Sequence, residues 1–120
     1  MVKGIVRKNR PLINLVVGWG IKAKEIVALV DTGFTGELKL SPKEVLDLGI
    51  TSTHLELIQL ANGKDAKMFA GMAMVSMEGI KNDVNVLVSG GIPTIGVGLL
   101  KRFEYNLNID FKNDLLVLQK

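Results

Sequence analysis

The tripeptide Asp31-Thr32-Gly33 is the segment of this sequence that is most suited to chemistry. Asp and Gly are common turn residues, so the triplet alone is compatible with an ordinary turn. Its context favours a functional site over an ordinary turn. The triplet ends an unbroken apolar run, Ile26 to Val30, that is typical of a fully buried strand. A carboxylate at the mouth of such a strand is poorly solvated, which favours its neutral form. Asp31 is therefore the first candidate for acid–base work.

The other polar residues offer poorer material for catalysis or metal binding. His54 is the only histidine and there is no cysteine, so nucleophilic catalysis lacks its usual groups, and we expect His54 at the surface. The glycines of Gly90–Gly98 lack the Lys-Ser/Thr ending of a phosphate-binding loop and are expected to be structural. Five further acids lie beside Gly, Lys or Asn, as in solvated turns: Asp47, Asp65, Asp83, Asp110 and Asp114. We expect no metal and no cofactor.

Composition bounds the class of protein. A chain of 120 residues with 48% hydrophobic residues and no cysteine suits one globular domain, residues 1–120, without disulfides. The net charge is +3, but the basic segment Arg7–Arg10 holds no aromatic residue, so no nucleic-acid partner is expected. No apolar run reaches the ~20 residues that span a membrane. Leu12–Gly20 could imitate a signal peptide, but Asn14 interrupts it, so we expect a cytoplasmic protein.

Most of the chain is predicted to form short strands. Apolar runs and alternating patterns are bounded by Gly, Pro, Asn and Asp, with a turn at Gly18-Trp19-Gly20 and another at Glu78-Gly79. The predicted strands are Val2–Arg7, Pro11–Val17, Glu25–Val30, Glu37–Leu40, Leu55–Leu60, Lys67–Met77, the alternating segment around Val84–Val88, Tyr105–Phe111 and Leu115–Gln119. The methionines Met68, Met72 and Met74 are expected to fill the core.

Two short helices and one marked hairpin complete the pattern. Ser41-Pro42-Lys43-Glu44 has an N-cap, a first-turn proline and a first-turn acid, and Gly49 supplies the C-terminal stop. A second helix is predicted at Val97–Glu104, after a tight apolar loop at Ile92–Gly96. Asn62-Gly63 is the strongest signal for a two-residue hairpin.

The two halves of the chain resemble each other weakly. Val27–Gly33 and Val84–Gly91 each combine a buried strand with a glycine break, and a short helix follows each of them. Two related halves folded over one barrel would give this pattern.

Three segments together resemble the clan AA aspartic proteases, the group that contains the retroviral proteases. Ala28–Gly33, Ala-Leu-Val-Asp-Thr-Gly, looks like their active-site segment, and Asn62-Gly63 lies where they have a flap over the substrate. Thr94-Ile95-Gly96 looks like the hydrophobic-hydrophobic-Gly element behind their active site. The likeness runs from about residue 11 to 111. Phe34 extends the triplet to Asp-Thr-Gly-Phe, which resembles the motif of a prokaryotic subgroup of single-domain aspartic proteases.

The resemblance implies a mostly β, closed retropepsin-like barrel with one or two short helices, paired as a two-fold homodimer. Peptide hydrolysis by this chemistry needs two carboxyl groups that share one proton, and one triplet per chain can supply them only across a two-fold axis. The implied substrate is a peptide or an unfolded protein. The implied catalytic residues are Asp31, Thr32 and Gly33, and the implied substrate-binding residues are Phe34, Ala61, Asn62, Gly63, Lys64 and Ile95.

The sequence departs from the retroviral pattern around the triplet and the later glycine. Thr35, Gly36 and Val97 stand where those enzymes carry acids and an arginine, so the salt bridge that braces their dimer should be absent. The first strand and the terminal hairpin are the predicted replacements. Two alternatives remain open: a similar dimer that binds an extended peptide or a partner without cutting it, and a β-barrel interaction domain with a chance triplet.

Overall fold

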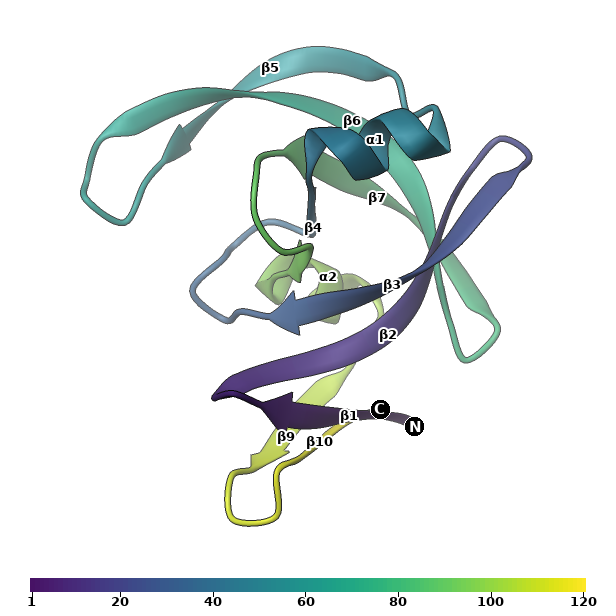
Figure 1. The fold of residues 1–120 in the computed structure, drawn as a ribbon, viewed down its shortest axis with the longest axis vertical. Coiled ribbons are helices and arrows are strands. Elements are labelled where there is room, and N and C mark those ends of the chain that lie inside the picture. Colours follow the sequence, from purple (N-terminus) through teal and green to yellow (C-terminus); the bar gives the residue numbers. More distant parts are fainter.

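The computed structural model describes all 120 residues, and strands dominate it (Figure 1). Two short helices are inserted, after the fourth and the eighth strand. In chain order the elements are β1 Val2–Arg7, β2 Arg10–Trp19, β3 Lys22–Val30, β4 Leu38–Leu40, α1 Pro42–Leu48, β5 Ser52–Gln59, β6 Asp65–Met77, β7 Ile80–Val88, β8 Thr94–Ile95, α2 Val97–Arg102, β9 Asn106–Asp110 and β10 Leu115–Gln119.

The central part of the sheet closes into a barrel. The strands β6, β7, β4, β8, β3 and β2 are neighbours in that order, and β2 pairs back onto β6 through Val17 and Val75. Both of these valines are fully buried, as are Leu38 and Ile95 from the other side of the ring. The predicted closed, mostly β barrel with two short helices is therefore confirmed.

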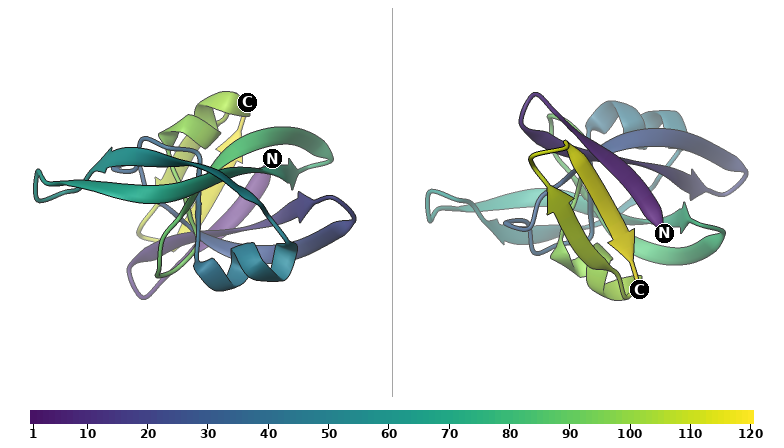
Figure 2. Two further views of the ribbon diagram at one scale, coloured as in Figure 1. Left: turned by 90° about the horizontal axis from the view of Figure 1, so that it is seen from above. Right: turned by 90° about the horizontal axis from the view of Figure 1, so that it is seen from below.

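Two parts of the sheet lie outside the ring. The hairpin β5–β6, here called the flap, projects from one side of the body (Figure 2). At the other end, β1 pairs with β2 on one edge and with β10 on the other, and β9 follows β10. The pairing with β10 runs from Val2 to Ile5 and the pairing with β2 from Ile5 to Arg7, so β1 joins the terminal hairpin to the barrel.

The helix ends follow their local sequence. The Ser41 hydroxyl accepts a hydrogen bond from the Glu44 N–H at 3.3 Å, and Pro42 is the first helical residue of α1. Gly49 ends α1 with φ 69°, the left-handed conformation that glycine adopts without a Cβ clash. The second helix stops at Arg102, two residues before its predicted end, where Glu104 turns to φ 59°.

Several strand predictions were too short, and one turn was misplaced. The hairpin of β2 and β3 turns at Gly20 and Ile21, because Gly18 and Trp19 still pair with Ala23 and Lys22. Also, β3 is not buried on both faces: Val27 is 50% exposed between the buried Ile26 and Ala28. The prediction that the apolar run Ile26 to Val30 is a fully buried strand was therefore wrong, because the outer face of β3 meets solvent.

The strand β6 changes its buried face along its length. In its first half, within the flap, Ala66 and Met68 are half-buried; in its second half the core-facing residues are Ala73, Val75 and Met77. Met72 and Met74 consequently point outward and are 38% and 40% exposed. The prediction that they fill the core was wrong, because the strand passes from the flap into the barrel and the role of each face reverses.

Candidate active site

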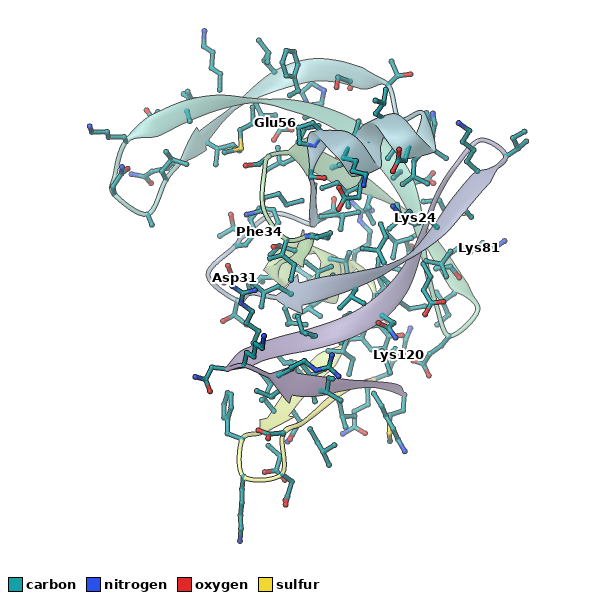
Figure 3. The ribbon with its side chains drawn as sticks, in the orientation of Figure 1. Lys24, Asp31, Phe34, Glu56, Lys81 and Lys120 are labelled. Carbon is teal, nitrogen blue, oxygen red and sulfur yellow. The ribbon has the colours of Figure 1, made fainter.

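Asp31 lies directly after β3, where that strand leaves the barrel wall (Figure 3). Its backbone N–H donates to the Ile95 carbonyl at 3.0 Å, which ties the loop to β8. Its side-chain Oδ1 accepts from the Gly33 N–H at 2.8 Å. These two bonds fix the backbone and orient the carboxyl group, so the side chain is aimed by the chain's own amides.

Asp31, Thr32 and Gly33 are all exposed within one copy of the chain. The expectation that the Asp31 carboxylate is poorly solvated is therefore wrong for the single protomer. The barrel strand ends at Val30, which is 4% exposed, and no other part of the chain covers the next residues. The Thr32 hydroxyl makes no hydrogen bond within the chain and is free to bond elsewhere.

The loop after the triplet packs tightly on the start of α2. The N–H groups of Val97 and Gly98 donate to the carbonyls of Phe34 and Gly36 at 2.9 and 3.0 Å. Gly96 allows this contact, because a Cβ on it would lie 2.3 Å from the Phe34 carbonyl oxygen. The glycine of the later element is required by the close approach of two backbones.

Ile95 supports the loop and does not face the cleft. Its side chain is 0% exposed in the barrel core, and its carbonyl holds the Asp31 N–H. A fully buried side chain cannot touch a substrate, so the expected substrate contact of Ile95 is replaced by a positioning role.

An ion-pair network that the sequence did not indicate lies under the same loop. Glu37 is 9% exposed, and both of its carboxylate oxygens accept from the Arg102 guanidinium, Oε1 from Nη2 at 2.9 Å and Oε2 from Nε. Asn85 adds a side-chain donor at 2.9 Å. The carboxylate beside it raises the pKa of Arg102 above its ordinary value. The only signals were an acid at the start of an apolar strand and an arginine 65 residues later.

A cavity of about 390 Å³ opens between the triplet loop and the first flap strand. Phe34 lines it, together with Glu56 and Ile58 of β5, and its contact with a substrate stays a prediction. Glu56 accepts a hydrogen bond from the ring of His54, whose Nε2 lies 2.9 Å away; His54 itself is exposed, as expected. Of the triplet, only Gly33 lines this cavity, which extends along the loop to Glu37.

The flap tip forms a longer loop than predicted. Five residues, Leu60 to Lys64, connect β5 and β6, and the Leu60 N–H donates to the Lys64 carbonyl at 2.7 Å. Gly63 takes the positive φ, 82°, that its place in the turn requires. The predicted binding residues Ala61, Asn62, Gly63 and Lys64 are exposed there and do not line the cavity beside the triplet.

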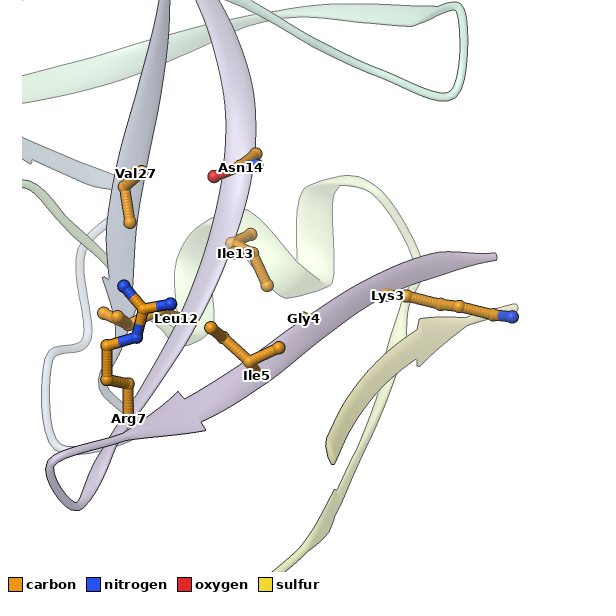
Figure 4. Close-up of a pocket in the computed structure, with 8 residues that line it drawn as sticks. All are labelled: Lys3, Gly4, Ile5, Arg7, Leu12, Ile13, Asn14 and Val27. Carbon is orange, nitrogen blue, oxygen red and sulfur yellow. The ribbon is translucent and has the colours of Figure 1, made fainter. Parts of the chain in front are cut away.

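A second cavity, of about 310 Å³, lies between β1, β2 and β3 (Figure 4). Lys3 and Arg7 contribute its charges, and no carboxylate lines it. It includes no residue of the triplet or of the flap, so it is separate from the candidate active site. The chain contains no group of three His, Cys, Asp or Glu side chains that could hold a metal ion.

No protein-family model matches this sequence, and no curated protein sequence matches it. Solved protein structures do match the fold of this chain. A retropepsin-like aspartic protease from Rickettsia conorii superposes with a TM-score of 0.67 at 24% identity, over 98% of this chain and 87% of that one. The EIAV protease complexed with the inhibitor HBY-793 superposes with a TM-score of 0.66 at 16% identity, over 85% of this chain and 95% of that one.

These comparisons define the class of fold: the chain has the retropepsin-like fold found in aspartic proteases. The fold covers nearly the whole chain, in agreement with the resemblance read from the triplet, the flap hairpin and Thr94-Ile95-Gly96.

Proposed function

We propose that this chain is an aspartic endopeptidase that works as a homodimer, with one Asp31 from each copy. In the proposed reaction, one carboxylate takes a proton from water while the other, protonated, gives a proton to the carbonyl oxygen of the peptide bond. Two carboxyl groups this close share one proton because both cannot ionise together. The observation that carries the proposal is the Asp31 side chain, held by the Gly33 N–H and open to solvent at the barrel rim.

The requirement for a second copy follows from this chemistry. One chain offers one Asp31, so a pair can form only across a two-fold axis, where each copy presents the same surface. The free Thr32 hydroxyl is available to bond across that axis and set the spacing of the two loops. Pairing would also bury the carboxylates that one copy leaves exposed.

The flap supports a peptide as the substrate. A peptide that lies over Asp31 would run as an added strand between the triplet loop and the flap, held mainly by backbone hydrogen bonds. In this proposal the exposed tip, Ala61 to Lys64, closes over the peptide and excludes water.

We propose that the β1–β2 turn and the β9–β10 turn form the dimer interface. The β1–β2 turn carries the unpaired cations Arg7, Lys8 and Arg10. It adjoins the β9–β10 turn, since the Val6 N–H donates to the Asp114 carbonyl at 2.9 Å. That second turn exposes 68% of Phe111 between Asp110 and Asp114.

Charge complementarity favours a second copy as the occupant of this surface. Asn113 donates to the Asp110 carboxylate and holds the pKa of Asp110 below its ordinary value, which keeps the carboxylate charged. The same turn also carries the exposed Lys112, so its two aspartates outnumber its one cation. In a two-fold arrangement the basic turn of one copy would meet Asp110 and Asp114 of the other, with Phe111 as the apolar anchor. In Figure 1 the β1–β2 turn lies on the same side of the molecule as the loop after β3.

No helix of the chain is long and apolar enough to cross a membrane. The segment Leu12–Gly20, which resembles a leader sequence, supplies most of the barrel strand β2. Removal of this segment would take away a barrel strand, and the cytoplasmic location stays a prediction.

Replacing the proposed catalytic acid tests the function directly. Asp31→Asn keeps the size of the side chain but cannot share a proton, so kcat/KM on an unfolded protein at mildly acid pH should fall by on the order of 10²–10⁴-fold. Thermal unfolding should be nearly unchanged, because the side chain is exposed. Asp47→Asn, an exposed acid on α1, is the matched control and should retain activity.

Full cleavage by the Asp31→Asn variant would remove Asp31 from the mechanism. If the wild-type chain cleaves no substrate but binds a noncleavable peptide with a reduced central bond, the alternative of a binding dimer without protease activity is correct. A strict monomer at high concentration would exclude the shared-proton site.

A further inference from the structure

The cavity beside the triplet has walls of two kinds. An apolar part is formed by Phe34, Ile58 and Leu87, and the charged groups are two acids, Glu37 and Glu56. No lysine, arginine or histidine lines it, and Lys39, which pairs in register with Leu87, is not among its walls. The remaining walls are polar or glycine: Gly33, Thr35, Gly36, Gln59 and Asn85. A cavity with three apolar side chains and two acids is complementary to a long side chain that ends in a cation.

Only one of the two acids is available to a ligand. The carboxylate of Glu37 is engaged on both oxygens by Arg102 and on one of them by Asn85. Glu56 has a side chain that is 38% exposed, and its Oε1 is within 2.9 Å of the His54 ring, which leaves Oε2 open. Glu56 is therefore the acid that can meet an incoming charge.

Glu56 lines the same cavity as Gly33, the last residue of the triplet. Glu56 and Ile58 lie on the same face of β5, the face that meets the cavity, whereas Leu55 and Leu57 point outward and are 55% and 66% exposed. In Figure 3 the labelled side chains of Asp31, Phe34 and Glu56 follow one side of the molecule, while Lys24, Lys81 and Lys120 lie on the other.

We propose that Glu56 selects substrates that carry lysine or arginine at the position whose side chain enters this cavity. The methylene stem of such a residue would lie against Phe34 and Ile58, and its charged head would reach the open oxygen of Glu56. This inference rests on the proposed peptidase function and adds its substrate class, a peptide with a basic residue beside the cleavage site.

The test compares pairs of peptides that differ only in the ammonium group of one side chain. Starting from a peptide that the wild-type dimer cleaves, each position within three residues of the cut is replaced in turn by lysine and by norleucine, which has the lysine stem without the ammonium group. At one position, kcat/KM should be about tenfold higher for lysine, equivalent to roughly 1.4 kcal/mol. The advantage should shrink as salt is added.

Glu56→Gln is the decisive variant. It should bring the ratio of kcat/KM for the lysine peptide to that for the norleucine peptide down to about one, whereas the matched control Glu25→Gln, an exposed acid on β3, should keep the wild-type ratio. Equal cleavage of both peptides by the wild type, or a preference that survives in Glu56→Gln, would overturn the inference and show an apolar pocket instead.

A binding measurement separates this inference from the proposed function. Noncleavable peptides with a reduced central bond, one with lysine and one with norleucine, are titrated into the wild type and into Glu56→Gln by calorimetry. A Glu56-dependent preference without any hydrolysis would uphold the pocket and reject the peptidase. Hydrolysis with no lysine preference in either assay would do the reverse.

Discussion

Among single residues, Glu37 combines deep burial with a negative charge. A buried carboxylate is costly unless it is paired and hydrogen-bonded, and Glu37 has Arg102 on both oxygens and Asn85 on one. The pair joins the end of the triplet loop to the last turn of α2.

Removing the cation should therefore destabilise the fold. Arg102→Leu leaves the Glu37 carboxylate buried without its main partner, and we expect a loss of about 1–3 kcal/mol in the free energy of unfolding. This is below the full cost of a broken buried pair, because 43% of the Arg102 side chain is exposed and water can reach the site. Urea denaturation at neutral pH measures this change in the free energy of unfolding.

Two further variants isolate the ion pair. Lys101→Leu removes the neighbouring exposed cation of α2, which forms no ion pair, and should change stability by less than about 0.5 kcal/mol. Adding Glu37→Gln to Arg102→Leu should recover part of the loss, since it removes the unpaired charge. Equal losses for Lys101→Leu and Arg102→Leu would contradict the account.

Among the elements, the triplet loop and the β8–α2 segment behave as one unit. Asp31 is held from behind by Ile95, and Phe34 and Gly36 receive hydrogen bonds from Val97 and Gly98. The parallel pairing of β3 with β8 and the antiparallel pairing of β4 with β8 place the short strand β8 between the two strands that flank the loop. The position of the carboxyl group therefore depends on a segment about 65 residues away.

A methyl group at Gly96 should disturb this unit. In Gly96→Ala the Cβ would meet the carbonyl oxygens of Phe34 and Gly36 at 2.3 and 2.4 Å, and neither backbone can move without shifting the loop. We expect a loss of about 1–3 kcal/mol in unfolding free energy. We also expect a fall in kcat/KM beyond what the loss of folded protein explains, measured on a variant kept fully folded at low temperature.

Gly90→Ala is the matched control for Gly96→Ala. A Cβ at Gly90 meets no atom within 4 Å, and its backbone does not need a glycine. Its stability and activity should stay close to the wild type. If Gly96→Ala also keeps wild-type stability and activity, the close approach of the two backbones does not constrain the site.

In the whole molecule, one copy of the chain leaves the triplet Asp31-Thr32-Gly33 exposed to solvent. The barrel buries β3 up to Val30 and then stops, so Asp31 needs another surface to become part of an enclosed site. Of the terminal strands, β1 pairs with both β2 and β10, whereas β9 forms one edge of the sheet. The exposed turns next to β1 remain as the contact we propose.

Breaking that contact should separate the copies. Phe111→Glu places a negative charge where the proposed interface has its apolar anchor, and the dimer dissociation constant should rise at least about tenfold. Sedimentation equilibrium measures this, and specific activity should fall with dilution more steeply than in the wild type. Leu46→Glu, an exposed residue of α1 at 79%, is the control and should leave the dimer intact. An unchanged dimer in Phe111→Glu would place the interface elsewhere.

Local chemistry allowed the sequence to predict much of this protein. The helix α1 begins at Pro42 and ends at Gly49 because its cap residues act on their own neighbours, and β10 has its predicted bounds. The triplet after an apolar strand, the flap turn at Asn62-Gly63 and the glycine after Ile95 all depend on short-range backbone geometry. Together they were sufficient to indicate the retropepsin-like fold that the solved structures share.

Tertiary structure alone decided which face of each strand is buried and which distant groups meet. Val27, Met72 and Met74 are exposed because their strands have one face outside the barrel, and an apolar pattern does not reveal that. The pairing of Glu37 with Arg102, the exposure of Asp31 and the placing of Glu56 in a cavity beside Phe34 likewise depend on contacts between residues far apart in the chain. Sequence patterns register neighbours along the backbone, whereas burial and electrostatic partners are set by how the closed sheet brings its strands together.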